Sequence, residues 1–148
     1  MPNNSETKFA GIEVAATTMR GVVMSAAGDV IERRATTYQP ENLIGGIVEL
    51  VTGLADTGPI KSVGVGIPGL VNRETDRVLM STGLPSAARQ DIHSELMKAT
   101  GLRFELENDA NAAAYGEYKA GAGRDARNIF YIGIGQAIGG AIIMDGKL

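Results

Sequence analysis

From residue 42 onward, the sequence alternates between segments with helical spacing and short β-rich runs, and this alternation limits the fold most strongly. Apolar residues in segment 42–58 recur at the spacing of a helix face, and Gly58-Pro59 is a typical helix stop. The run 60–69 is β-rich and ends in glycines, whereas 88–101 again predicts a helix that stops at Gly101. Alternation of this kind predicts an α/β fold: a central sheet with helices packed on it.

The other expected elements are short and complete the sheet. Strands are expected at 9–16, 20–26, 29–38 and 103–109, a turn at 27–29, a hairpin at 71–81, an alanine-rich helix at 110–123, and two strands around a glycine-rich turn at 128–148. Some neighbouring strands are joined by tight turns and others by helices. We therefore expect a mixed central sheet that contains both strand directions.

Composition and charge exclude several classes of protein. The 148 residues, 44% of them apolar, fit one packed domain. The net charge is −3 and no Lys/Arg run stands out, so we expect no nucleic-acid partner. The N-terminal segment is polar and no apolar run approaches 20 residues, so we expect no membrane partner. The absence of cysteine fits a cytoplasmic protein without thiolate metal sites.

The chain contains an internal repeat. Residues 12–24 and 132–144 align without a gap, and each reads as a strand, a turn of small residues and a second strand. In a protein with 20 glycines the similarity could be coincidence. Alternatively, the two hairpins are the opening units of two duplicated domains.

The stretch ENDANAAAYGE, residues 107–117, joins a predicted strand to a predicted helix. Ligands of open α/β sheets bind beyond the carboxyl ends of strands, and the amides at a helix start stabilise a carboxylate. Asp109 could therefore accept a proton from a hydroxyl, or it could be only the N-cap of the helix. For an isolated Asn-Asp pair, the N-cap is the favoured interpretation. His93, the sole histidine, is expected at the surface.

Two glycine- or alanine-rich turns and one glycine loop are further candidates. The run 64–69 matches G-x-G-x-x-G, but turn and strand residues follow it where a dinucleotide-binding motif needs a helix. It could bring a ligand to the backbone, or form a tight loop around Pro68. In the first hairpin, the turn amides with Thr17 and Thr18 could hold phosphate, and Glu13 could hold Mg²⁺ through water. The alternative is an ordinary hairpin with closely packed small residues.

Four segments in order, GIEVAATTMRGVV, GVGIPGLVN, ENDANAAAYGE and IGIGQAIGGAII, resemble the ROK family of sugar kinases and sugar-responsive repressors. The resemblance covers residues 9–148 and implies a ribonuclease-H-like domain of the actin-like ATPase fold. It implies a disordered polar end at 1–8, a ROK-type N-terminal domain at 9–127, and a glycine-rich hairpin at 128–148 that begins a second, absent domain. No helix-turn-helix segment precedes the domain, so the repressor branch is not expected.

The resemblance also implies site roles. Asp109 would take the proton from a sugar hydroxyl that attacks the γ-phosphate of ATP. The sugar would be bound by Asn108, Pro68, Gly69 and Gly83. The nucleotide phosphates would be bound by Thr17, Thr18, Gly135, Gln136 and Ala137. Glu13 would hold Mg²⁺ through water. The family's D-I-G-G-T loop is here Glu13 to Thr17, and two glycines in each phosphate loop are alanines. At Gly83, the family commonly has a sugar-binding Asn.

The expected function is therefore that of the N-terminal domain of a sugar kinase, incomplete or impaired as it stands. Family members continue with a second domain that adds sugar ligands and often a His/Cys zinc cluster; no zinc is expected in this chain. The alternative is a non-catalytic sugar- or nucleotide-binding relative, or a single-domain homodimer in which the repeated hairpin of one copy replaces a second-domain hairpin of the other. The partners would then be sugar, nucleotide and a second copy or separate second domain.

Overall fold

The computed structural model describes residues 7–135 and 137–148. Residues 1–6 of the expected disordered end and Gln136 of the expected phosphate loop lie outside the described residues. Strand β1 (Lys8–Val14) begins inside the segment 1–8, and the Thr7 carbonyl accepts the N–H of Ala26 at 3.0 Å. The sheet therefore begins one residue before the boundary expected from the sequence.

A five-stranded mixed sheet forms the body of the molecule, in the order β3-β2-β1-β4-β7. Its other strands are β2 (Thr18–Ser25), β3 (Val30–Thr37), β4 (Ile60–Ile67) and β7 (Arg103–Asn108). The β1–β2 and β2–β3 pairs are antiparallel, whereas β4 is parallel to both β1 and β7. The mixed strand directions expected from the sequence are confirmed.

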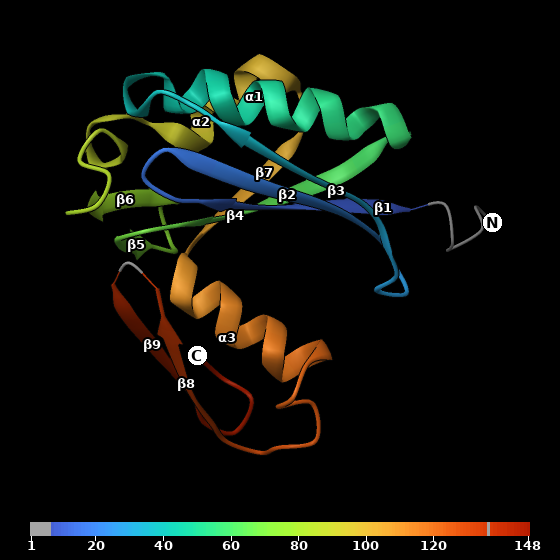
Figure 1. Cartoon of the computed structure of the whole chain (residues 1–148), viewed down its shortest axis with the longest axis vertical. Helices are drawn as coiled ribbons and strands as arrows, with labels where there is room; N and C mark the ends of the chain where they lie inside the picture. The colour runs from blue at the N-terminus through green and yellow to red at the C-terminus, as the bar shows by residue number, and fades with distance from the viewer. Residues whose placement is uncertain (1–6, 136) are drawn as a thin grey trace.

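Helices α1 (Leu43–Leu54) and α2 (Ile92–Thr100) cover one face of this sheet, as Figure 1 shows above the strands. Alternate residues of the strands, such as Ile12, Val65 and Phe104, are buried beneath them. Short 3₁₀ turns η1 (Pro40–Asn42), η2 (Ala55–Thr57) and η3 (Ala87–Arg89) flank the helices. Burial of this apolar layer from water stabilises the body.

The helix α2 begins later than its apolar pattern predicts. The expected start was residue 88, but the helix starts at Ile92 because the Asp91 side chain accepts the N–H of Ser94 at 3.3 Å and caps it. Its end at Gly101, which has a left-handed φ of 72°, is the expected one. The hairpin of β5 (Leu70–Asn72) and β6 (Arg77–Met80) is also confirmed.

The C-terminal part of the chain forms a second, smaller layer below the sheet (Figure 1). Helix α3 (Asp109–Ala120) follows β7 directly and packs against a separate two-stranded sheet of β8 (Ile129–Ile134) and β9 (Ile138–Ile143). We call α3, β8 and β9 the C-terminal unit. Its described buried core consists of three residues, Ala114, Ala141 and Ile143.

The two repeated hairpins differ in register by one residue. Val14 pairs with Met19 at the β1–β2 turn, but Ile134 pairs with Ile138 at the β8–β9 turn, which is one residue shorter. Because side chains alternate between faces, this change moves the second strand of the repeat to the opposite face. The gapless alignment of 12–24 with 132–144 therefore does not match equivalent faces.

Candidate functional site

The carboxyl ends of the three parallel strands meet at one edge of the sheet. Glu13 of β1 is paired with Gly66 of β4, and Gly66 with Glu107 of β7. The next pair, Ile67 with Asn108, leads into the Pro68-Gly69 loop on one side and into α3 on the other. This edge is where an open α/β sheet binds ligands, and Glu13, Asn108 and Asp109 all lie at it.

Asn108, and not Asp109, is the N-cap of α3. The Asn108 Oδ1 accepts the N–H of Asn111 at 3.0 Å, and Asp109 is the first residue of the helix. The N-cap interpretation of Asp109 is therefore wrong. The Asp109 Oδ1 accepts the N–H of Ala110 at 2.9 Å, and its side chain lines a cleft. A carboxylate in this position is stabilised by the amides at the helix start.

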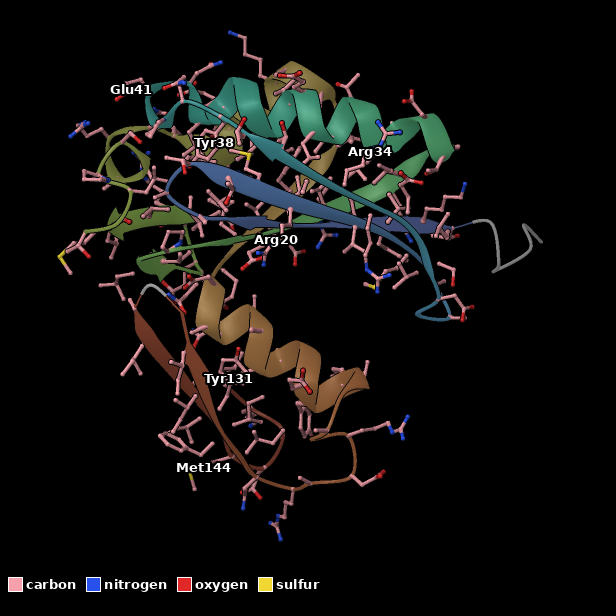
Figure 2. The ribbon with its side chains drawn as sticks, viewed as in Figure 1. Arg20, Arg34, Tyr38, Glu41, Tyr131 and Met144 are labelled. Atoms are coloured by element: carbon pink, nitrogen blue, oxygen red, sulfur yellow. The ribbon has the colours of Figure 1, made fainter. Side chains whose placement is uncertain are left out.

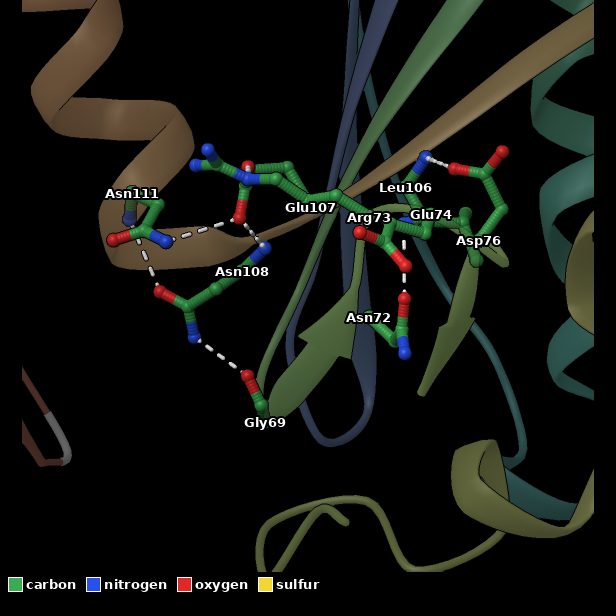
Figure 3. Close-up of polar contacts among 9 residues, drawn as sticks. All are labelled: Gly69, Asn72, Arg73, Glu74, Asp76, Leu106, Glu107, Asn108 and Asn111. Atoms are coloured by element: carbon green, nitrogen blue, oxygen red, sulfur yellow. Dashed lines mark hydrogen bonds and ion pairs between the residues drawn. The ribbon is translucent and has the colours of Figure 1, made fainter. Parts of the chain in front are cut away.

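The Pro68-Gly69 loop is held against α3 by the same Asn108 side chain. Its Nδ2 donates to the Gly69 carbonyl at 2.8 Å, as Figure 3 shows. Gly69 has a φ of 132°, and a Cβ at this position would lie 2.3 Å from the Met80 carbonyl oxygen. Only glycine fits there without strain, so the loop has a fixed shape beside the start of α3. No helix follows this loop, which agrees with the rejection of a dinucleotide-binding motif.

Glu107 connects three elements at this edge, and the sequence analysis missed this role. Its Oε1 accepts the backbone N–H of Asn108 at 2.7 Å and the Asn111 Nδ2 at 3.0 Å. Its Oε2 lies 2.5 Å from Arg73 Nε in the β5–β6 turn (Figure 3). In the sequence, the role of Glu107 is indicated only by its position next to Asn108 and Asp109. Its contact with Arg73 joins residues 34 positions apart, so no local pattern predicts it.

The first hairpin turn, residues 15–17, lies at the end of β1. Tyr38, the residue after β3, holds this turn: its hydroxyl donates to the Ala15 carbonyl at 2.7 Å, and its N–H donates to the Thr17 carbonyl at 3.1 Å. Burial raises the pKa of the Tyr38 hydroxyl, which keeps it a donor. Thr17 and Thr18 are exposed.

Glu13 is exposed on the face of the sheet that is turned toward α3. Its carboxylate pairs with Arg20 at 3.3 Å, and Figure 2 shows Arg20 at this face. Ion pairs as exposed as this one are weak, so the carboxylate can exchange partners with little cost. No group of three or more potential metal-ligating His, Cys, Asp or Glu residues occurs among the described residues.

The second turn, at the tip of β8–β9, lies near the start of α3. A Cβ on Gly139 would be 3.2 Å from the Ala110 Cβ, which places the beginning of β9 beside the residue that follows Asp109. Gly135 donates its N–H to the Ala137 carbonyl at 3.0 Å. Neither Ala15 nor Ala16 has a positive φ, so these two alanines cause no backbone strain.

A large open cleft of about 1510 Å³ separates the sheet from α3. Its walls include Glu13, Gly66 and Glu107 of the sheet, with Asp109 and Ala112 of α3. Gly83 lies in the turn after β6, where a Cβ would meet open space. That turn is near the Gly69 loop, because Ser81 is the neighbour of Gly69.

Within the described residues, no helix is long and apolar enough to cross a membrane.

The sheet order, the helices on its face and the ligand edge define a domain of the actin-like ATPase class. A ROK family glucokinase from Streptomyces griseus, solved with glucose and AMPPNP, superposes with a TM-score of 0.88 at 27% identity, over 95% of this chain and 45% of that one. The ROK family model matches residues 9–148. The chain belongs to the ROK family, and the fold expected from the sequence is confirmed.

Relatives of known activity support this assignment. The glucokinase of Streptomyces coelicolor is 35% identical over 141 residues, which cover 93% of this chain and 44% of that protein. The glucokinase of Thermotoga maritima is 33% identical over 145 residues, which cover 95% and 46%, respectively. The chain therefore spans about half the length of these relatives.

Proposed function

We propose that the chain is the N-terminal half of a ROK-type sugar kinase that transfers the γ-phosphate of ATP to a sugar hydroxyl. The observation that carries this proposal is the arrangement of Asp109 at the start of α3, beside a glycine loop fixed by Asn108. Two small-residue turns end at the same edge of the molecule. The similarity to glucokinases over nearly the whole chain supports the sugar as substrate class.

In this proposal, Asp109 is the general base. Its Oδ1 is occupied by the N–H of Ala110, so Oδ2 is the atom that accepts the hydroxyl proton. As the proton leaves, the sugar oxygen forms a bond to the γ-phosphorus and the bond from that phosphorus to the bridging oxygen of ADP breaks. Asn108 has one further amide hydrogen that can bind the sugar while the other holds Gly69.

The two turns would bind the nucleotide phosphates through their backbone N–H groups. Thr17 and Thr18 add exposed hydroxyl donors, and Gly135 and Ala137 belong to the opposite turn. Gln136, the third predicted residue of that turn, keeps its role only as a sequence prediction. Pro68, Gly69 and Gly83 would line the sugar side.

The chemistry of Glu13 fits an outer ligand of Mg²⁺. Glu13 is paired with Gly66, which is in turn paired with Glu107, and the weak ion pair of its exposed carboxylate with Arg20 can be replaced. When bound with ATP, the ion neutralises charge on the phosphates. Magnesium usually needs only one or two carboxylates beside phosphate and water, so a cluster of three acidic side chains is not required.

A second candidate function is binding of sugar or nucleotide without phosphoryl transfer. It is favoured by Ala15, Ala16 and Ala137, whose methyl groups occupy positions where family loops have glycine. The methyl groups would narrow the approach of phosphate to the backbone, although Ala15 and Ala16 have no positive-φ strain. In either case ATP as the nucleotide implies a cytoplasmic location.

The test is a coupled assay of ADP release with ATP, Mg²⁺ and a panel of hexoses. We expect a low turnover that is reduced by at least about a hundredfold in Asp109→Asn. The matched control is Glu105→Gln, which neutralises another carboxylate on the same cleft wall. Sugar or nucleotide binding by calorimetry without any turnover would favour the second candidate. No binding of either ligand would refute both functions.

A further inference from the structure

The β5–β6 hairpin holds the end of β7 at two points. At the base of the hairpin, the Gly69 carbonyl accepts the hydrogen bond of Asn108 Nδ2 at 2.8 Å. At its tip, the Asp76 Oδ1 accepts the backbone N–H of Leu106 at 3.3 Å. Because β7 is an edge strand of the sheet, its outward N–H groups need partners from outside the sheet. Between these two contacts lies Glu107, which the hairpin holds by a third.

The third contact joins opposite charges. Arg73 Nε lies 2.5 Å from Glu107 Oε2, and the Glu107 side chain is only 25% exposed (Figure 3). The other carboxylate oxygen, Oε1, accepts the backbone N–H of Asn108 at 2.7 Å and the Nδ2 of Asn111 at 3.0 Å. Both oxygens therefore have donors, and these donors come from the hairpin, the end of β7 and the first turn of α3. A carboxylate held from three directions has a fixed orientation.

The two groups that Glu107 Oε1 holds lie on either side of Asp109. The Asn108 N–H comes directly before it in the chain, and the Asn111 side chain comes two residues after it. The Asp109 Oδ1 is itself fixed by the N–H of Ala110 at 2.9 Å. The direction of the free Asp109 Oδ2 therefore depends on a segment that Glu107 holds at both ends.

We propose that Arg73 and Glu107 form a positioning pair that holds Asp109 in the orientation its role as base requires. The inference rests on the proposed function for that role, but the placement of the Asp109 side chain can be measured without turnover. When Arg73 is lost, Glu107 Oε2 loses its cation, and the carboxylate can turn toward water and release the two donors on Oε1. A misplacement of about 1 Å at a reacting group can cost about a hundredfold in rate, so a weak pair can have a large kinetic effect.

The same hairpin contains a matched control for Arg73. Arg77 on β6 pairs with Asp91 Oδ2 at 3.2 Å, and its side chain is 47% exposed, compared with 48% for Arg73. The partner of Arg77 caps α2, whereas the partner of Arg73 holds the start of α3. Arg77→Gln therefore removes a comparable ion pair from the hairpin without touching the segment around Asp109.

Hydrogen exchange followed by NMR tests the placement without any substrate. The amides of Asn108 and Ala110 report on the pair, because the first is bound by Glu107 and the second by the Asp109 side chain. Arg73→Gln should speed their exchange by at least about threefold, and Arg77→Gln should leave it unchanged. Unchanged exchange in Arg73→Gln would overturn the inference, whatever the chain does with ATP.

The assay of ADP release tests the consequence for the reaction. Arg73→Gln should lower kcat by about tenfold and change the sugar KM by less than about twofold, because Asn108 keeps its bond to the Gly69 carbonyl. Arg73→Lys keeps the charge and should recover part of the loss.

Glu107→Gln should lower kcat similarly, and the double variant with Arg73→Gln should lose little more, since the two residues act as one pair. Urea denaturation shows whether each variant is folded under assay conditions. Equal losses in Arg73→Gln and Arg77→Gln, additive losses in the double variant, or a raised KM with unchanged kcat would overturn the inference. A wild-type chain without ADP release would refute the proposed transfer, and the exchange of the two amides would still decide the placement of Asp109.

Discussion

The body and the C-terminal unit are built from similar hairpins, but they bury their apolar residues to very different extents. In the body, helices α1 and α2 lie over the sheet and more than twenty residues belong to one core, including Met19, Leu43 and Ile67. In the C-terminal unit, α3 covers only one face of β8–β9, and three residues are fully buried. The comparison shows that an apolar strand pattern predicts a sheet, but the covering layer decides how stable that sheet is.

The largest expected difference concerns the two cores. Phe104→Ala should destabilise the whole body by about 3–5 kcal/mol, because a large side chain that is 1% exposed leaves a cavity. Ile143→Ala, in the small core, should leave the main urea transition unchanged and remove hydrogen-exchange protection only in β8 and β9. Equal shifts of the main transition in both variants would show that the two regions unfold as one.

The next effect concerns the Gly69 loop of the body, which contacts Asn108 at the start of the C-terminal unit. Gly69→Ala should cost about 1–3 kcal/mol, because it combines a positive φ with a contact to the Met80 carbonyl. Gly83→Ala is the matched control, since its new methyl group meets open space, and we expect little change. Urea denaturation measures both. A neutral Gly69→Ala would mean that the loop is not held in the described shape.

A smaller effect is expected for the cap of α3. Asn108→Ala should cost about 1 kcal/mol and increase exchange of the amides in the first turn of α3, because the bond to the Asn111 N–H is lost. The control is Asn72→Ala, which removes an Asn that binds backbone N–H groups within the body, at Glu74 and Thr75. Faster exchange in α3 in both variants would contradict a local role for Asn108.

The smallest expected effect is a pH dependence of the stability of the body. The hydrogen bond from the Ser94 backbone N–H is the main cause that lowers the pKa of Asp91 below its usual 3.8. A hydrogen bond from the Ser94 side chain lowers it further. The folded state therefore favours the charged form, and this stabilisation is complete above pH 3.8 and is lost as the pH falls through the lowered pKa.

Asp91→Asn tests this pH dependence. Asparagine still caps the helix but does not titrate, so the variant should lose less stability in acid than the wild type does. Exchange rates of the α2 amides between neutral and acidic pH provide the measurement. Identical acid profiles in the two proteins would contradict the role of Asp91.

Much of the fold was predictable because it depends on local patterns. Helical spacing and Gly58 located α1, and the alternating runs located the strands of the mixed sheet. The start of α2 was misplaced because residues 88–91 are compatible with a helix until the Asp91 cap is considered. The register of β8–β9 depends on the length of one turn, which a gapless alignment of the repeat conceals.

The candidate site was predictable in its positions but not in its contacts. Strand ends and glycines indicated Asp109, Asn108 and the Gly69 loop. Which of the two polar residues caps α3 depends on where the helix begins, and both fit the cap pattern. The pairs of Glu107 with Arg73 and of Asn108 with Gly69 join segments more than thirty residues apart, so no local pattern reports them.

The amide of Asn108 also has a mechanical consequence. Within the described residues, the chain passes from the body to the C-terminal unit at Asn108–Asp109, and the cleft lies between these two parts. Asn108 Oδ1 holds the first turn of α3, and its Nδ2 holds the Gly69 carbonyl. This one side chain therefore ties the direction in which α3 leaves the sheet to the shape of the Gly69 loop.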